Sequence, residues 1–248
     1  MKVNRISLQE WSFLAYETPK NLIRIGSAED GGYVTSKKAI VASEYLLSGG
    51  ISFNPEFEID FYHINPKSKM VLIDGSITNL HFLLGPFVRK LMGKSFTRAL
   101  LRTGEFFYIK RRSTFIKEFI NDKKNISWFL KHFSEKAKGY LKLDIEGSEW
   151  ILLTDILKNQ DCFNGISIEF HDVPSNIKYL ENFVSQLDHK IGFIEINGGA
   201  GFENGMPKVL EISFLKPDFI ENENDIQYLH LRRPYKQQEK DAYIPVFD

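Results

Sequence analysis

The sequence lacks several features that would assign it to a specialised class of protein. Its 248 residues contain one cysteine, Cys162, which excludes an internal disulfide framework and suits a reducing compartment. Thirty-two basic and thirty-two acidic residues leave no formal net charge, so the whole molecule does not attract nucleic acid or an anionic membrane. No run of about 18 uncharged apolar residues and no cleavable signal pattern occurs. We therefore expect a soluble, cytoplasmic protein without a transmembrane segment.

Repeats of fixed period and low-complexity tracts are also missing, which excludes solenoids and disordered arrays. Hydrophobic residues make up 43% of the chain, enough for one sizeable core. We expect an N-terminal helix and an Asp-Gly-Gly-Tyr loop in residues 1–44, a core in residues 45–220, and a tail in residues 221–248 that packs on the core. A homodimer that uses this tail is an open alternative.

Apolar segments that end in glycine or in an acid alternate with helical patterns. The expected core strands are residues 43–50, 68–76, 139–147 and 165–172, with helices at 148–159 and 176–188. Another strand is expected at 105–112, within a mostly helical stretch. Segments 191–198 and 208–215 are joined without a helix, so we expect them to be antiparallel, whereas a parallel crossover needs about a dozen residues. The sequence predicts an α/β fold with a mostly parallel sheet, an antiparallel last strand and helices on both faces.

Acidic residues gather where two of these strands end. Asp144 and Glu146 are two positions apart and are expected on one face of their strand, and Glu169 and His171 are expected on one face of the next. Carboxylates at a sheet centre are costly unless they are paired, and ligands of open α/β sheets bind beyond the carboxyl ends of the strands. We therefore expect the four side chains to converge in a site. Glu149, in the first helical turn, is expected to be structural.

Six segments resemble the FkbM-like family of S-adenosylmethionine-dependent methyltransferases. In chain order they are "RIGSAEDGGYV", "LLSGGISFNPEFE", "VLIDGS", "YLKLDIEGSEW", "ISIEFH" and "MPKVLEISFL", which span roughly residues 22–215. The resemblance implies a Rossmann-like methyltransferase sheet and methyl transfer to an oxygen atom. The implied acceptor is a sugar, nucleotide-sugar or glycan, as in the biosynthesis of bacterial surface polysaccharides.

The resemblance also implies where the cofactor would bind. The backbone around Ser48, Gly49 and Gly50 would hold the methionine part of S-adenosylmethionine, and Asp74 would accept hydrogen bonds from the ribose. Asp144 would lie near the sulfonium. The glycine turn departs from the fuller Gly-x-Gly of many methyltransferases, because Ile51 follows Gly50. The spaced glycines of an NAD-dependent enzyme are missing as well.

Catalysis and acceptor binding are assigned to further residues. His171 is the first choice as general base because its unperturbed pKa is about 6.5, with Glu169, Glu146 or Asp172 as its orienter or substitute. The acceptor is expected to contact a set of three residues: Asp30, Tyr33 and Asn197. A divalent metal on Asp144, Glu169 and His171, with Glu146 nearby, is an open alternative, although no compact ligand motif demands it.

A basic, aromatic segment occupies residues 86–125. It holds eleven Lys or Arg against three acidic residues. One interpretation is a flap that binds an anionic substrate or the surface of a membrane; the other is an amphipathic helical pair with its charges in water. No nucleic-acid-binding motif accompanies the segment. The alternative function is therefore a non-catalytic methyltransferase-like module that binds an anionic partner through this segment.

Overall fold

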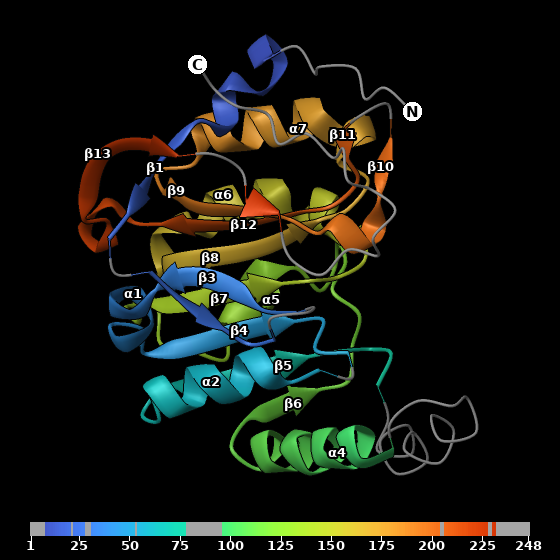
Figure 1. Cartoon of the computed structure of the whole chain (residues 1–248). Helices are drawn as coiled ribbons and strands as arrows, with labels where there is room; N and C mark the ends of the chain where they lie inside the picture. Colours follow the sequence, from blue (N-terminus) through green and yellow to red (C-terminus); the bar gives the residue numbers. More distant parts are fainter. Residues whose placement is uncertain are drawn as a thin grey trace.

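An eight-stranded sheet forms the centre of the computed structural model, which describes residues 8–20, 22–27, 31–52, 54–77, 96–203, 206–227 and 230–231. The strands follow the order β14-β9-β12-β8-β7-β4-β5-β6 (Figure 1). Their bounds are β4 (Tyr45–Gly49), β5 (Lys69–Ile73), β6 (Thr114–Ile116), β7 (Gly139–Leu143), β8 (Phe163–Phe170), β9 (Lys190–Ile196), β12 (Leu210–Leu215) and β14 (His230–Leu231).

Strand β12 is antiparallel to both of its neighbours, β8 and β9, whereas the other pairs in the sheet are parallel. The antiparallel pairing of the segments around residues 191–198 and 208–215 is thus confirmed. If the seven strands from β6 across to β9 are numbered by their order along the chain, their order across the sheet is 3-2-1-4-5-7-6. This order, with a reversed seventh strand, is that of the Rossmann-like methyltransferase sheet.

Helices cover both faces of the sheet, as predicted. One face packs against the 3-10 helix η1 (Leu8–Leu14), α5 (Ile126–Leu130), α6 (Leu153–Asn159) and α7 (Val173–Gln186). The other packs against α1 (Lys37–Val41), α2 (Glu56–Ile64), α4 (Phe96–Lys110) and the hairpin of β2 (Leu22–Ile25) and β3 (Tyr33–Ser36). Alternation along β7 explains the two layers, because Leu141 and Leu143 enter one core and Tyr140 enters the other.

Shorter elements complete the described chain. The single-turn 3-10 segments are η2 (Ser148–Leu152), η3 (Gln160–Cys162), η4 (Gly198–Ala200) and η5 (Pro217–Phe219). The small strands are β1 (Tyr16–Pro19), β10 (Phe202–Glu203), β11 (Met206–Pro207) and β13 (Asn222–Gln227). Among the described helices, none combines the length and the apolar character needed to cross a membrane.

The strand expected at residues 105–112 is wrong. Most of this segment belongs to α4, where Phe106 and Ile109 are buried three positions apart, and the strand is β6 at Thr114–Ile116. Two short strands follow the antiparallel β12 in the chain: β13 pairs with β1, and β14 pairs with β9. These pairings join part of the predicted tail to the rest of the fold. Residues 232–248 and 78–95 lie outside the described residues.

Candidate active site at the carboxyl edge of the sheet

The chain turns sharply after β4, at Gly50. Its φ is +73°, and a Cβ added there would lie 1.6 Å from the backbone oxygen of Asp144, so only glycine fits. The Gly50 N–H donates to the Ile73 carbonyl at 3.0 Å. The end of β4 is thereby held between its neighbours β5 and β7. Of the three predicted turn residues, Gly50 lines a pocket, whereas Ser48 is fully buried and donates to Glu58 Oε1 at 2.5 Å.

Asp74 connects this turn to the one after β5. Its Oδ2 accepts from the N–H groups of Ile51 at 3.0 Å and Ser52 at 2.8 Å. Its Oδ1 accepts from the N–H and the hydroxyl of Ser76, at 2.8 and 2.6 Å, and from the Ile77 N–H at 3.2 Å. An ionised carboxylate has about four lone-pair positions, so these five bonds use its capacity. A ribose hydroxyl would have to displace one of them.

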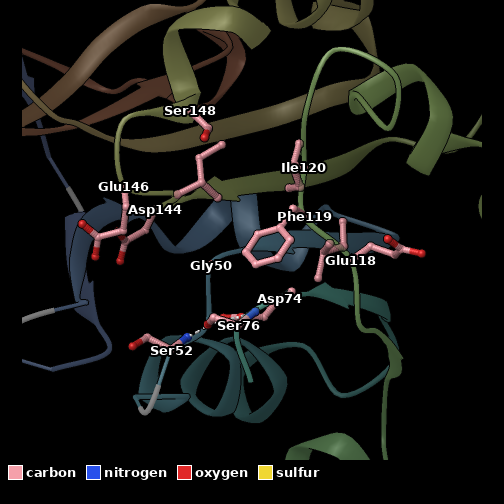
Figure 2. Close-up of a pocket in the computed structure, with 13 residues that line it drawn as sticks. Gly50, Ser52, Asp74, Ser76, Glu118, Phe119, Ile120, Asp144, Glu146 and Ser148 are labelled. Carbon is pink, nitrogen blue, oxygen red and sulfur yellow. Dashed lines mark hydrogen bonds between the residues drawn. The ribbon is translucent and has the colours of Figure 1, made fainter. Parts of the chain in front are cut away.

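A pocket opens beyond the ends of β4, β5 and β7. Figure 2 shows Asp144 and Glu146 on one side of it and Glu118 and Phe119 on the other. Phe119 is 65% exposed, and its ring lies against Gly75. The full lining is Gly50, Ser52, Ile73, Asp74, Gly75, Ser76, Glu118, Phe119, Ile120, Asp144, Ile145, Glu146 and Ser148. These residues include four carboxylates and no lysine or arginine, so the lining is acidic, although Lys124 pairs with Glu118 and Lys142 lies 3.7 Å from Asp144 Oδ2.

Asp144 and Glu146 do not share a strand face, so that prediction is wrong. Strand β7 ends at Leu143, and Glu146 has a φ of +53° in the turn that follows. This left-handed residue is followed by Gly147, whose φ is +96°. The turn points the Glu146 side chain into solvent, where it is 86% exposed, whereas the Asp144 side chain is 18% exposed.

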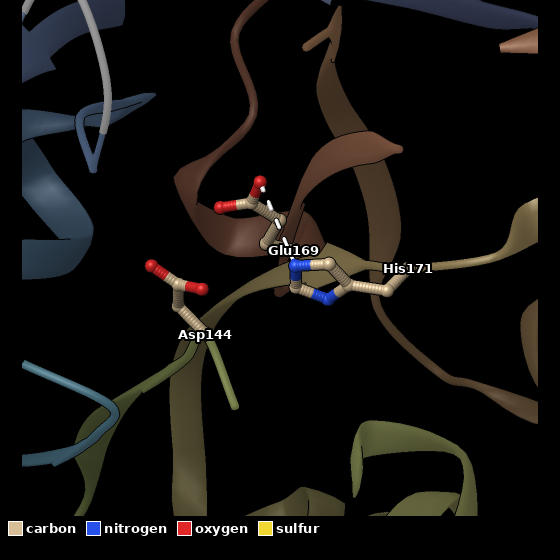
Figure 3. A group of neighbouring side chains, drawn as sticks. All are labelled: Asp144, Glu169 and His171. Atoms are coloured by element: carbon tan, nitrogen blue, oxygen red, sulfur yellow. Dashed lines mark ion pairs between the residues drawn. The ribbon is translucent and has the colours of Figure 1, made fainter. Parts of the chain in front are cut away.

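Asp144, Glu169 and His171 nevertheless converge (Figure 3). Each of the three residues offers one atom that could bind a metal, a carboxylate oxygen or a ring nitrogen, and these three atoms all lie within 4.8 Å of one another. His171 Nε2 faces Glu146 Oε2 at 3.5 Å and Glu169 Oε1 at 3.9 Å. Both distances exceed ordinary hydrogen-bond length. The convergence predicted from the strand ends is therefore observed, with His171 one residue beyond the end of β8.

Glu149 fixes the position of His171 and was expected to be only structural. Its fully buried carboxylate accepts from the His171 backbone N–H at 2.6 Å and contacts His171 Nδ1 at 3.1 Å through Oε1. Its Oε2 accepts from the Gly147 N–H at 2.9 Å. Trp150 Nε1 donates to the His171 carbonyl at 2.8 Å. The turn after β7 thus holds His171 both by its backbone and by its ring.

The surroundings of His171 change its pKa. Burial alone would lower it, but the hydrogen bond and the charge of Glu149, together with the charges of Glu169 and Asp144, raise it to about 9. The expected value near 6.5 is therefore corrected. At neutral pH the imidazole carries a positive charge that balances part of the surrounding negative charge.

Two more buried glutamates continue the site across the sheet. Glu169 on β8 is paired in register with Glu211 on β12, and Glu211 with Glu195 on β9. The Arg24 guanidinium donates to Glu195 Oε1 at 2.5 Å. We did not predict this acidic row from the sequence. Its signal is an acid at the matching position of three apolar segments, "ISIEF", "VLEIS" and "FIEIN".

A row of polar side chains lies beside the acidic row, on the same face of the sheet and two residues away along β8 and β12. It joins Ser48, Lys142, Ser167 and Ser213 across β4, β7, β8 and β12. Lys142, which is 3% exposed, donates to the Gly50 carbonyl at 2.5 Å and lies 3.7 Å from Asp144 Oδ2. This lysine supports the glycine turn from beneath and was also not predicted.

The predicted acceptor residues have separate outcomes. Asn197 Nδ2 donates to Glu169 Oε1 at 2.9 Å, so it adjoins the cluster. Tyr33 is 1% exposed and packs edge-on against Phe57, which corrects its expected place in an acceptor channel. Asp172 is exposed at the start of α7, with a φ of +48°. Asp30 lies outside the described residues.

Comparisons with known proteins give similarity to solved structures only. No family model matches the chain, and no curated protein matches its sequence. Precorrin-6y C5,15-methyltransferase from Geobacter metallireducens is 11% identical, with a TM-score of 0.40 over 72% of this chain and 83% of that one. Aeropyrum pernix fibrillarin with natively bound S-adenosyl-L-methionine is 11% identical, with a TM-score of 0.40 over 71% and 68%. The mitomycin 7-O-methyltransferase is 8% identical, with a TM-score of 0.35 over 85% and 54%. At this similarity, membership of the FkbM-like family stays a prediction.

Proposed function

We propose that this chain is an S-adenosylmethionine-dependent methyltransferase that methylates a hydroxyl oxygen of a carbohydrate or glycoconjugate precursor. The observation that carries the proposal is an acidic pocket that adjoins an acid and imidazole cluster, at the carboxyl edge of a sheet with methyltransferase strand order. The sequence resemblance supports the carbohydrate acceptor and a role in bacterial surface polysaccharide biosynthesis.

The pocket suits the net charge of S-adenosylmethionine. The cofactor carries a positive sulfonium, an ammonium group and one carboxylate, so its net charge is positive, and four carboxylates line the pocket. An anionic pyrophosphate would meet repulsion from the same groups, which disfavours a dinucleotide. The exposed ring of Phe119 offers a stacking face for the adenine, and Gly50 lines the pocket without a side chain, which leaves room for the methionine part.

Catalysis then depends on how the residues of this chain hold the acceptor. When bound, S-adenosylmethionine supplies the methyl group: an oxygen–carbon bond forms as the carbon–sulfur bond breaks, and the sulfonium becomes a neutral thioether. Asp144, Glu169 and His171 orient the acceptor hydroxyl in line with that bond, which is the main source of acceleration in such a displacement. Glu146 lies where pocket and cluster meet and accepts the hydroxyl proton, because its exposed carboxylate can pass the proton to water.

The first experiment is isothermal titration with S-adenosylmethionine and with its demethylated product, in buffer with EDTA. We expect saturable binding of both in the micromolar range. Transfer of a labelled methyl group to a panel of sugars, nucleotide-sugars and amines then tests the acceptor class. A folded protein that binds neither compound contradicts the proposal. Methylation of amines but not of sugars contradicts the oxygen acceptor.

The described part of the basic segment gives little support to the alternative, non-catalytic function. Lys110 lies over the rings of Phe106 and Phe115, at 5.5 and 4.8 Å from their centroids, and Arg112 lies 3.7 Å from the centroid of Tyr108. These cations contact aromatic rings of their own segment, as in an amphipathic helix with packed side chains. Residues 86–95 of the segment lie outside the described residues.

A further inference from the structure

We propose that Asp144, Glu169 and His171 form a binding site for one divalent cation, Mn²⁺ or Mg²⁺. Their nearest ligand-type atoms lie within 4.8 Å of one another. Ligand atoms about 2.0 to 2.2 Å from an ion lie roughly 3 to 4.4 Å apart, so a small contraction of the side chains closes the site. The role of this cation in catalysis, but not its binding, rests on the proposed methyl transfer.

The orientation of His171 is a second observation that supports ligation. Metal-binding histidines commonly donate their second ring N–H to a carboxylate, which fixes the tautomer and directs the other nitrogen at the ion. Glu149 is in place for this role, since its Oε1 lies 3.1 Å from His171 Nδ1. Nε2 faces Glu169 at 3.9 Å, beyond hydrogen-bond length, and a bound ion would take the place of the proton that Nε2 carries in the metal-free protein. Glu149 is fully buried and is not itself a ligand, so it has the place of an outer-shell partner.

The donor set selects the kind of ion. Two carboxylates and one imidazole, without a thiolate, suit hard or borderline ions such as Mg²⁺ and Mn²⁺ and disfavour soft ones. Negative charge from Glu211, opposite Glu169 on the next strand, adds to the attraction, whereas Glu195 is paired with Arg24. Glu146 Oε2, 3.5 Å from Nε2, can add a further contact directly or through water.

The position of the site suggests its use. Asp144 belongs both to the cluster and to the lining of the pocket, so a cation there would face the acceptor side of the bound cofactor. A divalent ion that binds a hydroxyl oxygen lowers the pKa of that hydroxyl and fixes its direction. A pair of neighbouring hydroxyls, as in a sugar, could bind it together. Glu146 would then accept the released proton.

Titration of the full-length protein with MnCl₂ tests the site without cofactor or acceptor. Electron paramagnetic resonance follows the loss of the free Mn²⁺ signal, and its pulsed form detects nitrogen from a bound imidazole. We expect one site per chain with a dissociation constant below about 100 μM, competition by Mg²⁺, and a nitrogen coupling that disappears in His171→Gln. Saturation only at millimolar Mn²⁺, or no nitrogen coupling, overturns the proposal.

Charge-matched variants separate a ligand from general acidity. Glu169→Gln should weaken Mn²⁺ binding at least tenfold, and Glu149→Gln about tenfold through the orientation of His171. Glu211→Gln removes the same charge from the neighbouring register position and should change affinity less than threefold. Equal losses in Glu169→Gln and Glu211→Gln would show diffuse attraction and overturn the site. Circular dichroism and thermal melts confirm that each variant is folded.

The metal site and the proposed function can fail separately. Mn²⁺ binding without any binding of S-adenosylmethionine leaves the site intact and removes the methyltransferase. Cofactor binding and methyl transfer in EDTA at the full rate, with no Mn²⁺ binding, keep the methyltransferase and remove the metal.

Discussion

The two sides of the carboxyl edge are built in different ways. On the β4 and β5 side the pocket wall depends on backbone: Gly50 fits only without a Cβ, and Asp74 is held by four N–H groups and one hydroxyl. On the β7 and β8 side the cluster depends on side chains that hold other side chains, as Glu149 holds His171. The first side should therefore be sensitive to added atoms, and the second to removed charges.

The largest effect is expected from Glu146→Gln. The variant keeps the shape of an exposed side chain but removes the proposed proton acceptor, so the turnover number should fall about 10²- to 10⁴-fold. The affinity for S-adenosylmethionine should change less than threefold. Steady-state kinetics at saturating cofactor, together with isothermal titration, give both values.

Glu118→Gln is the matched change on the other wall of the same pocket. Its carboxylate pairs with Lys124 at 2.5 Å and lies on the opposite side of the pocket from Asp144 and Glu146 in Figure 2. We expect a few-fold weaker cofactor binding and an unchanged turnover number at saturation. Loss of turnover in both variants alike would mean that the two walls do not have separate roles.

Gly50→Ala should have the next largest effect, on folding. The new Cβ meets the Asp144 backbone at 1.6 Å in a left-handed conformation, which we expect to cost at least about 3 kcal/mol. Gly147→Ala is the control, because it has a φ of +96° but nothing within 4 Å of the added Cβ. It should cost only about 1 to 2 kcal/mol. Urea unfolding gives both values, and equal losses would show that the backbone contact at Gly50 is not limiting.

The sequence was sufficient for the framework of the site and insufficient for its details. Strand ends marked by Asp74, Asp144 and Glu169 were predictable because apolar runs that stop at acids are unusual, and the carboxyl edge then brings them together. The pKa of His171 was not predictable, since it depends on Glu149 and Asp144, which reach it only through the fold. The side chain of Glu146 was misplaced because a left-handed residue after β7 breaks the alternation of a strand.

Lys142 and the glutamates opposite Glu169 show the same limit. Each is a polar residue within an apolar strand, which is visible in the sequence, but register alone decides what it faces. Glu211 lies opposite both Glu169 and Glu195 because β12 inserts between β8 and β9. The strand at 105–112 was mispredicted for a related reason, because consecutive aromatic residues fit a helix as well as a strand until their burial is known.

The stability of the fold should depend on pH through a residue remote from both walls. His189 is 4% exposed, and burial is the first cause that lowers its pKa to about 4, while its Nε2 lies 2.9 Å from the Phe163 carbonyl. Above pH 6.5 the His189 imidazole is neutral in both the folded and the unfolded protein. As the pH falls toward 4, the unfolded chain binds a proton that the folded protein resists, so stability is lost.

The expected loss between pH 7 and pH 5 is at most about 2 kcal/mol from this group. Urea unfolding at both values measures it, and His189→Gln should lose correspondingly less. An equal loss in the variant would assign the acid sensitivity to other groups. The comparison also matters for the cluster, because activity lost in acid must be corrected for unfolding before it is ascribed to the site.

Phe119→Ala on the cofactor wall should change cofactor affinity alone. Stacking of a base on an aromatic ring contributes about 1 to 3 kcal/mol, so the affinity for S-adenosylmethionine should fall about tenfold. Turnover at saturating cofactor should hold, because the ring is on the side of the pocket away from Asp144 and Glu146. Phe119→Tyr keeps the ring and should retain the affinity. If Phe119→Ala binds as tightly as the natural protein, the adenine does not lie on this wall, and the division of the edge into a cofactor side and a chemical side fails.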